Sequence, residues 1–169
     1  MDMEAAMKRI PPHSAEAEQA VLGAMLMNKE AITVASEILS GDDFYQTAYG
    51  ILFNSMVELF HAGKPVDLIT LQEYLKEKDV PSEISSMEFA RDLLMGTQTS
   101  ANIKSYAEIV REKSIMRRLI KVNEETANAC YLQNQPLEEI LEDAQKQVFA
   151  LAETGNSEEY VPIKQVVLN

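Results

Sequence analysis

Few residues of this chain belong to types that carry out covalent or metal chemistry, and their spacing favours neither. His13 and His61 are its two histidines, and Cys130 is its one cysteine. A zinc site needs several His or Cys ligands at short spacing, and these three residues are far apart in the chain. His61 is better explained as a cation at the end of a helix, and Cys130 as a buried thiol on the apolar side of a helix. The sequence therefore predicts no metal site and no nucleophile.

A nucleotide site is not indicated either. Phosphate-binding loops need glycines whose backbone amides surround the phosphate, followed by Gly-Lys-Ser/Thr. The six glycines are scattered, and the only Gly-Lys pair, Gly63-Lys64, is followed by Pro65. The paired acids Asp42-Asp43 and Glu158-Glu159 lie in a predicted turn and a predicted linker, where solvation explains them. We predict that residues 1–169 hold no catalytic residue and no cofactor.

One face of the longest predicted helix is basic. Lys113, Arg117 and Lys121 recur every four residues, which places them on one side of a helix. Like charges at this spacing repel by roughly 0.2–0.5 kcal/mol per pair unless a partner neutralises them. We expect the acidic helix that follows in the chain to do so. An acidic partner protein or a phosphate group is the alternative.

The elements that carry these residues are two amphipathic segments, at residues 102–131 and 137–152, joined by a turn. Apolar residues recur in both at alternating four- and three-residue steps, the period of a helix face. Pro136 suits a first helical turn and ends the break between the segments. The sequence therefore predicts an antiparallel helical hairpin. The recurring residues are Ile115, Leu119, Val122, Thr126 and Ala129, then Leu137, Leu141, Ala144, Val148 and Leu151.

The predicted hairpin has more apolar surface than two helices can bury between themselves. Its first segment would run ~45 Å at 1.5 Å per residue, longer than a compact domain of this size needs. Some apolar face must therefore meet either the rest of the chain or another chain, and the pattern leaves both open. For a second chain, the predicted dimer contacts are Ile115, Leu119, Val122, Leu141 and Val148.

Residues before the hairpin are predicted to form a compact head of about five helices. Ser14 is the expected N-cap of the first helix, which ends near Met27, and Gly23 inside it predicts the close approach of a neighbouring helix. Gly41 is expected to stop the second helix in a left-handed conformation. Two further helices have capping-box spacing, at residues 70–73 and 85–88.

Composition bounds the class of protein. The chain has 169 residues and a net charge of −12, which argues against a dominant nucleic-acid surface because phosphate contacts need clustered cations. A single cysteine fits a reducing cytosol, and no stretch has the length of a membrane span. Strand-like alternation is absent, so we expect a soluble, cytoplasmic, all-α protein. The predicted domain limits are a flexible tail at 1–9, the head at 10–100, the hairpin at 101–152 and a linker at 153–169.

The chain resembles the N-terminal part of bacterial DnaB-type replicative helicases. The resemblance begins with IPPHSAEAEQAVLG at residues 10–23 and continues, in order, at residues 44–45, 65–71, 101–103, 106–110 and 112–120. It covers residues 10–152. Two departures concern helix starts: Gln98 stands where the family usually has proline, and Ser85-Ser86 stands where it has Gly-Gly.

This resemblance implies how the domain works. It implies hairpins that pack antiparallel into dimers, dimers that build the N-terminal collar of a hexameric ring, and docking of the C-terminal domain of a DnaG-type primase. A helicase loader is a further implied partner. ATP and Mg would belong to a RecA-like motor domain that follows the linker and is absent from residues 1–169. The implied location is the replication fork on the bacterial nucleoid, with little direct DNA binding by this part of the chain.

The primase surface must stay accessible after the hairpins have dimerised. The candidates are Phe89, in the short helix before the hairpin, and Met116, Arg117 and Ile120 on the outer side of the long helix. A purely structural explanation is that Phe89 and Ile120 seal the head against the hairpin. The competing functions are a free-standing helical adaptor or regulator that resembles a helicase collar and, more remotely, an enzyme with a hidden site. A Gly-Lys-Thr loop encoded after Asn169 would favour the helicase.

Overall fold

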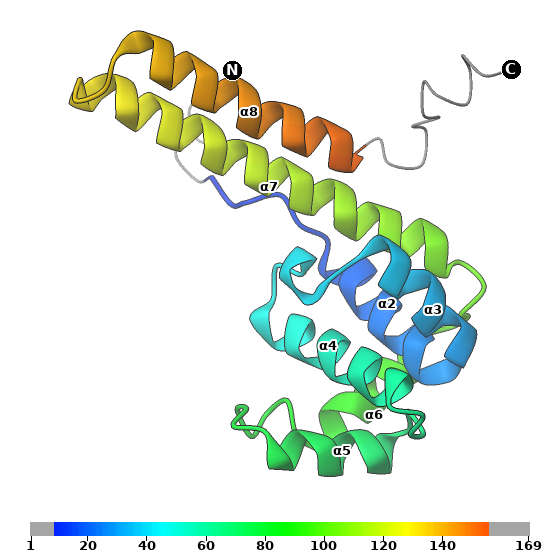
Figure 1. Ribbon diagram of the computed structural model, residues 1–169. Coiled ribbons are helices and arrows are strands. Elements are labelled where there is room, and N and C mark those ends of the chain that lie inside the picture. The colour runs from blue at the N-terminus through cyan, green and yellow to red at the C-terminus, as the bar shows by residue number, and fades with distance from the viewer. Residues whose placement is uncertain (1–8, 156–169) are drawn as a thin grey trace, which may run out of the picture. The chain divides into compact units, whose positions relative to one another are not determined.

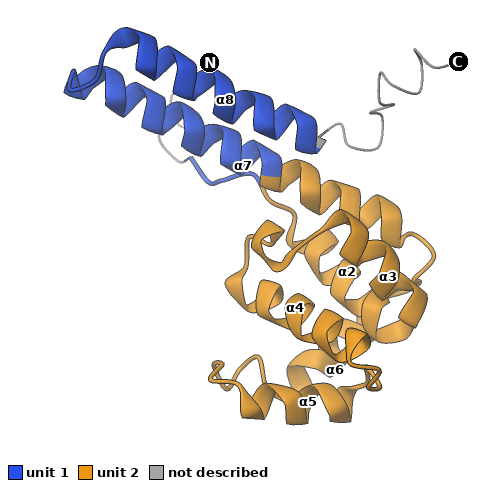
Figure 2. Ribbon diagram, viewed as in Figure 1, with its two compact units in different colours: residues 1–12, 115–169 blue, residues 13–114 orange. Residues whose placement is uncertain are grey.

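The computed structural model describes residues 9–155, and over that range it contains seven α-helices, one 3₁₀ helix and no strand (Figure 1). The predicted all-α class is confirmed. The chain divides into two compact units, residues 13–114 and residues 1–12 with 115–169 (Figure 2). The elements are α2 (Ala15–Met27), α3 (Lys29–Ile38), η1 (Gly41–Asp43), α4 (Thr47–His61), α5 (Leu68–Glu77), α6 (Met87–Met95), α7 (Ile103–Leu132) and α8 (Leu137–Gly155).

The division between the units falls inside α7, between Ser114 and Ile115. The head and hairpin limits expected at residues 100 and 101 stay predictions. The tail expected at 1–9 and the linker expected at 153–169 lie mostly outside the described residues. Within residues 9–155, no helix is long and apolar enough to cross a bilayer.

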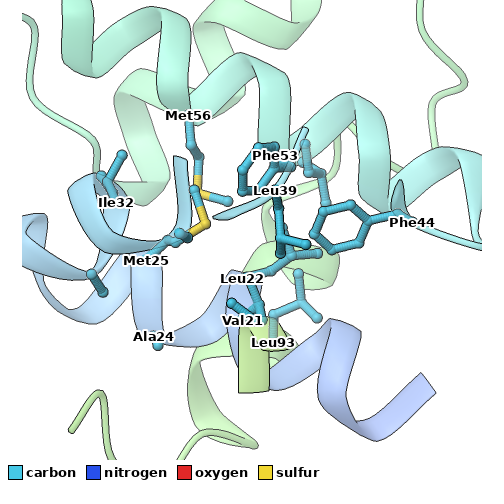
Figure 3. Close-up of a cluster of buried hydrophobic side chains, with 14 of the residues drawn as sticks. Val21, Leu22, Ala24, Met25, Ile32, Leu39, Phe44, Phe53, Met56 and Leu93 are labelled. Atoms are coloured by element: carbon cyan, nitrogen blue, oxygen red, sulfur yellow. The ribbon is translucent and has the colours of Figure 1, made fainter. Parts of the chain in front are cut away.

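The core of the 13–114 unit is built from apolar faces of α2, α3 and α4 (Figure 3). Removing this apolar surface from water is the main force that holds the helices together. Leu93 on α6 closes the cluster from another side. The fully buried large side chains of the cluster include Leu22, Met25, Ile32, Phe53 and Met56.

Gly23 confirms the predicted close approach. A Cβ on this residue would lie 1.6 Å from Thr97 Oγ1 and 2.8 Å from the backbone oxygen of Leu93. Thr97, two residues after the end of α6, and the backbone of Leu93 on α6 therefore pack directly on the backbone of α2. By contrast, the left-handed stop predicted at Gly41 is wrong: Gly41 begins η1, and Gly63 is the described glycine with positive φ.

The helix starts follow side-chain capping, at positions partly different from those predicted. Ser14 caps α2 as expected, accepting from the Ala17 amide at 3.2 Å. The cap of α5 is Asp67 rather than Thr70, and it accepts from the Thr70 amide at 2.8 Å. The cap of α6 is Ser86 rather than Ser85. Aspartate and serine both cap well, so local sequence left these registers undecided.

α4 begins without a cap of its own, because its N-cap residue Gln46 makes no side-chain capping bond. The buried carboxylate of Glu18 on α2 takes this role. Its Oε2 accepts from the Tyr45 amide at 3.0 Å and its Oε1 from the Gln46 amide at 3.3 Å. Helix N-termini leave amides without intrahelical partners, so this bond pair ties α2 to the start of α4.

A second buried polar pair joins η1 to α7 within the same unit. Ser114 Oγ donates to Asp43 Oδ1 at 2.8 Å, and Asp43 Oδ2 accepts from the Ser40 amide at 2.8 Å. Both side chains are buried. Because buried polar groups are costly unless paired, these bonds fix the position of η1 against α7.

α8 and residues 115–132 of α7 form the predicted hairpin, with α8 running back along α7 (Figure 1). The turn between them contains Gln133 in a left-handed conformation, φ 53°. Among the described residues of this unit, Val122 and Ile140 are buried, and they mark the face where its helices meet. Cys130 is exposed, so the buried thiol predicted there is wrong.

Candidate protein-interaction surfaces

The outer side of α8 carries large apolar residues exposed to solvent. Leu141 is 54% exposed, Val148 43% and Phe149 65%. Val148 and Phe149, with Ala144 and Ala152, line a shallow apolar depression on the helix surface. Exposed apolar area of this kind marks interaction sites in soluble proteins.

The predicted dimer residues divide between the two faces of the hairpin. Leu119, Leu141 and Val148 are exposed and available to a partner, and Ile115 is half-buried. Val122 is only 8% exposed. Its own hairpin already covers it, so its burial needs no second chain. The dimer contact itself stays a prediction.

Sequence reasoning missed three exposed apolar residues of the hairpin. They are Tyr131, Leu132 and Phe149. The sequence pattern places Leu137, Leu141 and Val148 in one stripe with Ala144 and Leu151, although residues 137, 141 and 148 lie on a face displaced from 140, 144 and 151. The burial of Ile140 and the exposure of Leu141 show that displacement.

Of the predicted primase residues, two line a cavity of about 630 Å³ beside residues 9–11. Arg117 and Ile120 line it together with Arg9, Ile10 and Pro11. Arg117 Nη1 donates to the backbone oxygen of Pro12 at 2.8 Å and so holds residues 9–12 against α7. Met116 and Ile120 are exposed.

Phe89 lies elsewhere, on α6 of the 13–114 unit, where it is half-buried. Its ring centroid is 5.8 Å from that of Tyr49, and both rings line a surface cavity of about 430 Å³. Gln19 Nε2 donates to the Tyr49 hydroxyl at 2.9 Å. Glu16 and Asp92 add carboxylates to the lining. The cavity offers an acidic, aromatic surface to a partner.

The described residues do not bring metal-ligating side chains together. Over residues 9–155, no group of three or more His, Cys, Asp or Glu could hold a metal ion. The ring of His13 stacks on Tyr45 with centroids 4.1 Å apart, and His61 lies in the last turn of α4. Both histidines therefore have structural contacts in the 13–114 unit.

A strong polar cluster braces α4 against α5. The Tyr74 hydroxyl and Lys78 Nζ both donate to Glu58 Oε2, the latter at 2.6 Å. The bond from Lys78 lowers the pKa of Glu58, and the bond to Glu58 raises the pKa of Tyr74. Because these groups are largely exposed, solvent weakens the ion pair, and we assign the cluster a structural role.

Comparison with known proteins identifies the family. The sequence model described as "DnaB-like helicase N terminal domain" matches residues 10–112. The chain is 39% identical over 160 residues to the replicative DNA helicase DnaC of Bacillus subtilis, covering 95% of this chain and 35% of that protein. It is 40% identical over 145 residues to the replicative DNA helicase DnaB of Pasteurella multocida, covering 85% and 31%. The chain thus spans about a third of the length of these curated relatives.

Solved structures agree with the sequence match. The crystal structure of the N-terminal domain of DnaB helicase from Mycobacterium tuberculosis superposes with a TM-score of 0.78 at 31% identity, covering 83% of this chain and 99% of that one. A DnaB-like replicative helicase described with its interactions with primase shares the fold, with a TM-score of 0.65 at 20% identity, covering 88% of this chain and 36% of that one. The chain therefore belongs to the DnaB-like helicase N-terminal domain family.

Proposed function

We propose that this chain is the assembly and primase-recruiting domain of a hexameric replicative DNA helicase. The observation that carries the proposal is the exposed apolar face of α8 around Leu141. Hairpins would dimerise through this face, and dimers would form the collar of the ring. ATP hydrolysis and unwinding would belong to the part of the relatives beyond this match. Under this proposal the chain acts at replication forks on the bacterial nucleoid, and a helicase loader is a further partner.

Dimerisation is tested by placing a charge on the outer face. Leu141→Asp is expected to keep the wild-type Tm, because Leu141 is 54% exposed, and to abolish the dimer in light scattering. Leu119→Asp should act the same way. The matched control is Ile140→Asp, one residue earlier on α8 and buried, which should lower Tm by destroying the contact with α7. A folded Leu141→Asp chain that dimerises like wild type would contradict the proposal.

Primase recruitment is proposed for the accessible candidates. The structural neighbour described with primase supports a primase partner, and exposure supports Met116 and Ile120 as anchors. Phe89 is supported by its place in an aromatic cavity. Truncating one anchor typically costs 2 kcal/mol or more, about a thirtyfold loss of affinity. Arg117 has a competing structural role, since it holds Pro12.

The test measures primase affinity and Tm together for Phe89→Ala, Met116→Ala and Arg117→Ala. Loss of affinity at unchanged Tm supports recruitment by that residue. Loss of Tm with retained affinity would mean that the residue is part of the packing only. Met95→Ala is the control, because Met95 is exposed on the same helix as Phe89 and lies outside the cavity lining.

A further inference from the structure

Residues 9–12 form an irregular segment that belongs to the same compact unit as residues 115–132 of α7 (Figure 2). Arg117 Nη1 donates to the backbone oxygen of Pro12 at 2.8 Å, and this bond is partly buried. Ile10 and Pro11 line one cavity together with Arg117 and Ile120. We call residues 9–12 the N-terminal strap. The strap therefore lies over the part of α7 that carries two of the candidate primase anchors.

The strap is held loosely. Pro11 and Pro12 have no backbone N–H, so neither can donate a hydrogen bond to α7. Ile10 leaves 71% of its side chain exposed, and the cavity of about 630 Å³ is space that the side chains of the strap and of α7 do not fill. Segments with few buried apolar contacts open at a low cost in free energy. The strap can therefore leave α7 while the hairpin stays folded.

The strap and a docking partner need the same atoms of α7. A partner that takes Arg117 as an anchor needs its guanidinium group, and that group already donates to Pro12. A partner that packs on Ile120, which is 44% exposed, must enter the cavity that Ile10 and Pro11 line. Docking at these two residues of α7 therefore requires the strap to move.

We propose that the N-terminal strap is an autoinhibitory contact, which occupies Arg117 and Ile120 until a partner displaces it. The inference rests on the proposed function, because it takes primase as the partner that docks on α7. The apparent dissociation constant rises in inverse proportion to the fraction of chains in which the strap is open. A strap that is open in about a tenth of the chains therefore weakens docking about tenfold.

Loosening the strap tests this competition. Ile10→Gly/Pro11→Gly removes two side chains that line the cavity and increases the backbone freedom of the released strap, while both anchors on α7 stay unchanged. The affinity for the C-terminal domain of primase, measured by isothermal titration calorimetry, should rise about three- to tenfold. Pro81→Gly changes an exposed proline of the other unit and should bind like wild type. Light scattering and Tm check that self-association and folding are unchanged.

Locking the strap tests the same contact in the opposite direction. In a Cys130→Ser background, Ile10→Cys and Glu124→Cys place one thiol on the strap and one on α7, both beside the cavity. A bis-maleimide with an internal disulfide joins the two thiols, and reduction cuts the linker. The joined chain should bind primase at least about tenfold more weakly, and reduction should restore the affinity of the same sample. Each single-cysteine variant carrying the same reagent is the matched control.

The outcomes separate the strap from the function on which it rests. Unchanged or weaker primase binding by Ile10→Gly/Pro11→Gly at wild-type Tm overturns autoinhibition, and weaker binding would make the strap part of the docking surface. A joined chain that binds like wild type overturns it too. In each of these cases wild type still binds primase, so the proposed recruitment stands. If primase binds neither wild type nor the loosened chain, the proposed recruitment and the strap both fall.

Discussion

Glu18 offers the sharpest test of how the head is held together. The substitution Glu18→Ala removes a carboxylate that is 1% exposed and that accepts from the amides of Tyr45 and Gln46. Hydrogen bonds to a charged group contribute about 1.5–3 kcal/mol each, and the amides of two exposed residues would lose their acceptor. Releasing the carboxylate from burial offsets part of this loss. We expect a net destabilisation of about 3 kcal/mol.

The assay is urea unfolding followed by circular dichroism, with Tm as a second measure. For a chain of 169 residues the loss corresponds to a Tm decrease of roughly 6–12 °C. The free energy of unfolding of Glu18→Gln should lie between those of wild type and Glu18→Ala. The side-chain oxygen of glutamine can accept from one of the two backbone amides, while its NH₂ group faces the other. An unchanged dependence of the unfolding free energy on urea concentration would show that the substitution lowers stability without changing the surface exposed on unfolding.

Glu16→Ala is the matched control. Glu16 lies in the same first turn of α2 but is exposed, so its loss should cost about 0.5 kcal/mol through the helix dipole alone. A typical surface substitution changes the free energy of unfolding by no more than about 0.5 kcal/mol. The reasoning is refuted if the free energies of unfolding of Glu18→Ala and Glu16→Ala differ by less than about that amount. A loss of stability at Glu18 would also affect a candidate binding surface, because α4 carries Tyr49, and Tyr49 lines the same cavity as Phe89.

Three further predictions follow from the packing and capping of the head. Gly23→Ala should destabilise by about 2 kcal/mol in urea unfolding, despite the better helix propensity of alanine, because the added Cβ meets Thr97; equal or greater stability would contradict the close packing. Ser114→Ala should cost about 1–2 kcal/mol because it leaves buried Asp43 without that donor, and a neutral effect would refute the pairing. The Thr70 amide lowers the pKa of Asp67, so this cap contributes stability above its unfolded pKa of about 3.9 and loses it as pH falls through the lower folded pKa. Asp67→Asn should flatten that part of the stability curve between about pH 2 and pH 5; an unchanged curve would exclude the cap.

Local sequence determined the helices of this protein well. Ser14 caps α2 where capping chemistry predicts, and the apolar period that begins at Leu137 matches the observed start of α8. These signals are local because a cap or a helix face depends on residues within a few turns. Where two caps competed within three residues, as Asp67 and Thr70 did, the local signal was ambiguous.

Tertiary structure decided which residues are buried and which stay at the surface. Sequence showed an acid at Glu18 in a first turn, and only the fold brings the start of α4, 27 residues away, onto its carboxylate. Likewise the hairpin pattern contained adjacent apolar stripes, and packing against α7 buried Ile140 and left Leu141 and Phe149 outside. Helical period alone cannot choose between neighbouring stripes, because the choice depends on the rotation of each helix about its axis. That rotation is set by the contacts between the helices, and it decides which apolar face remains for a partner.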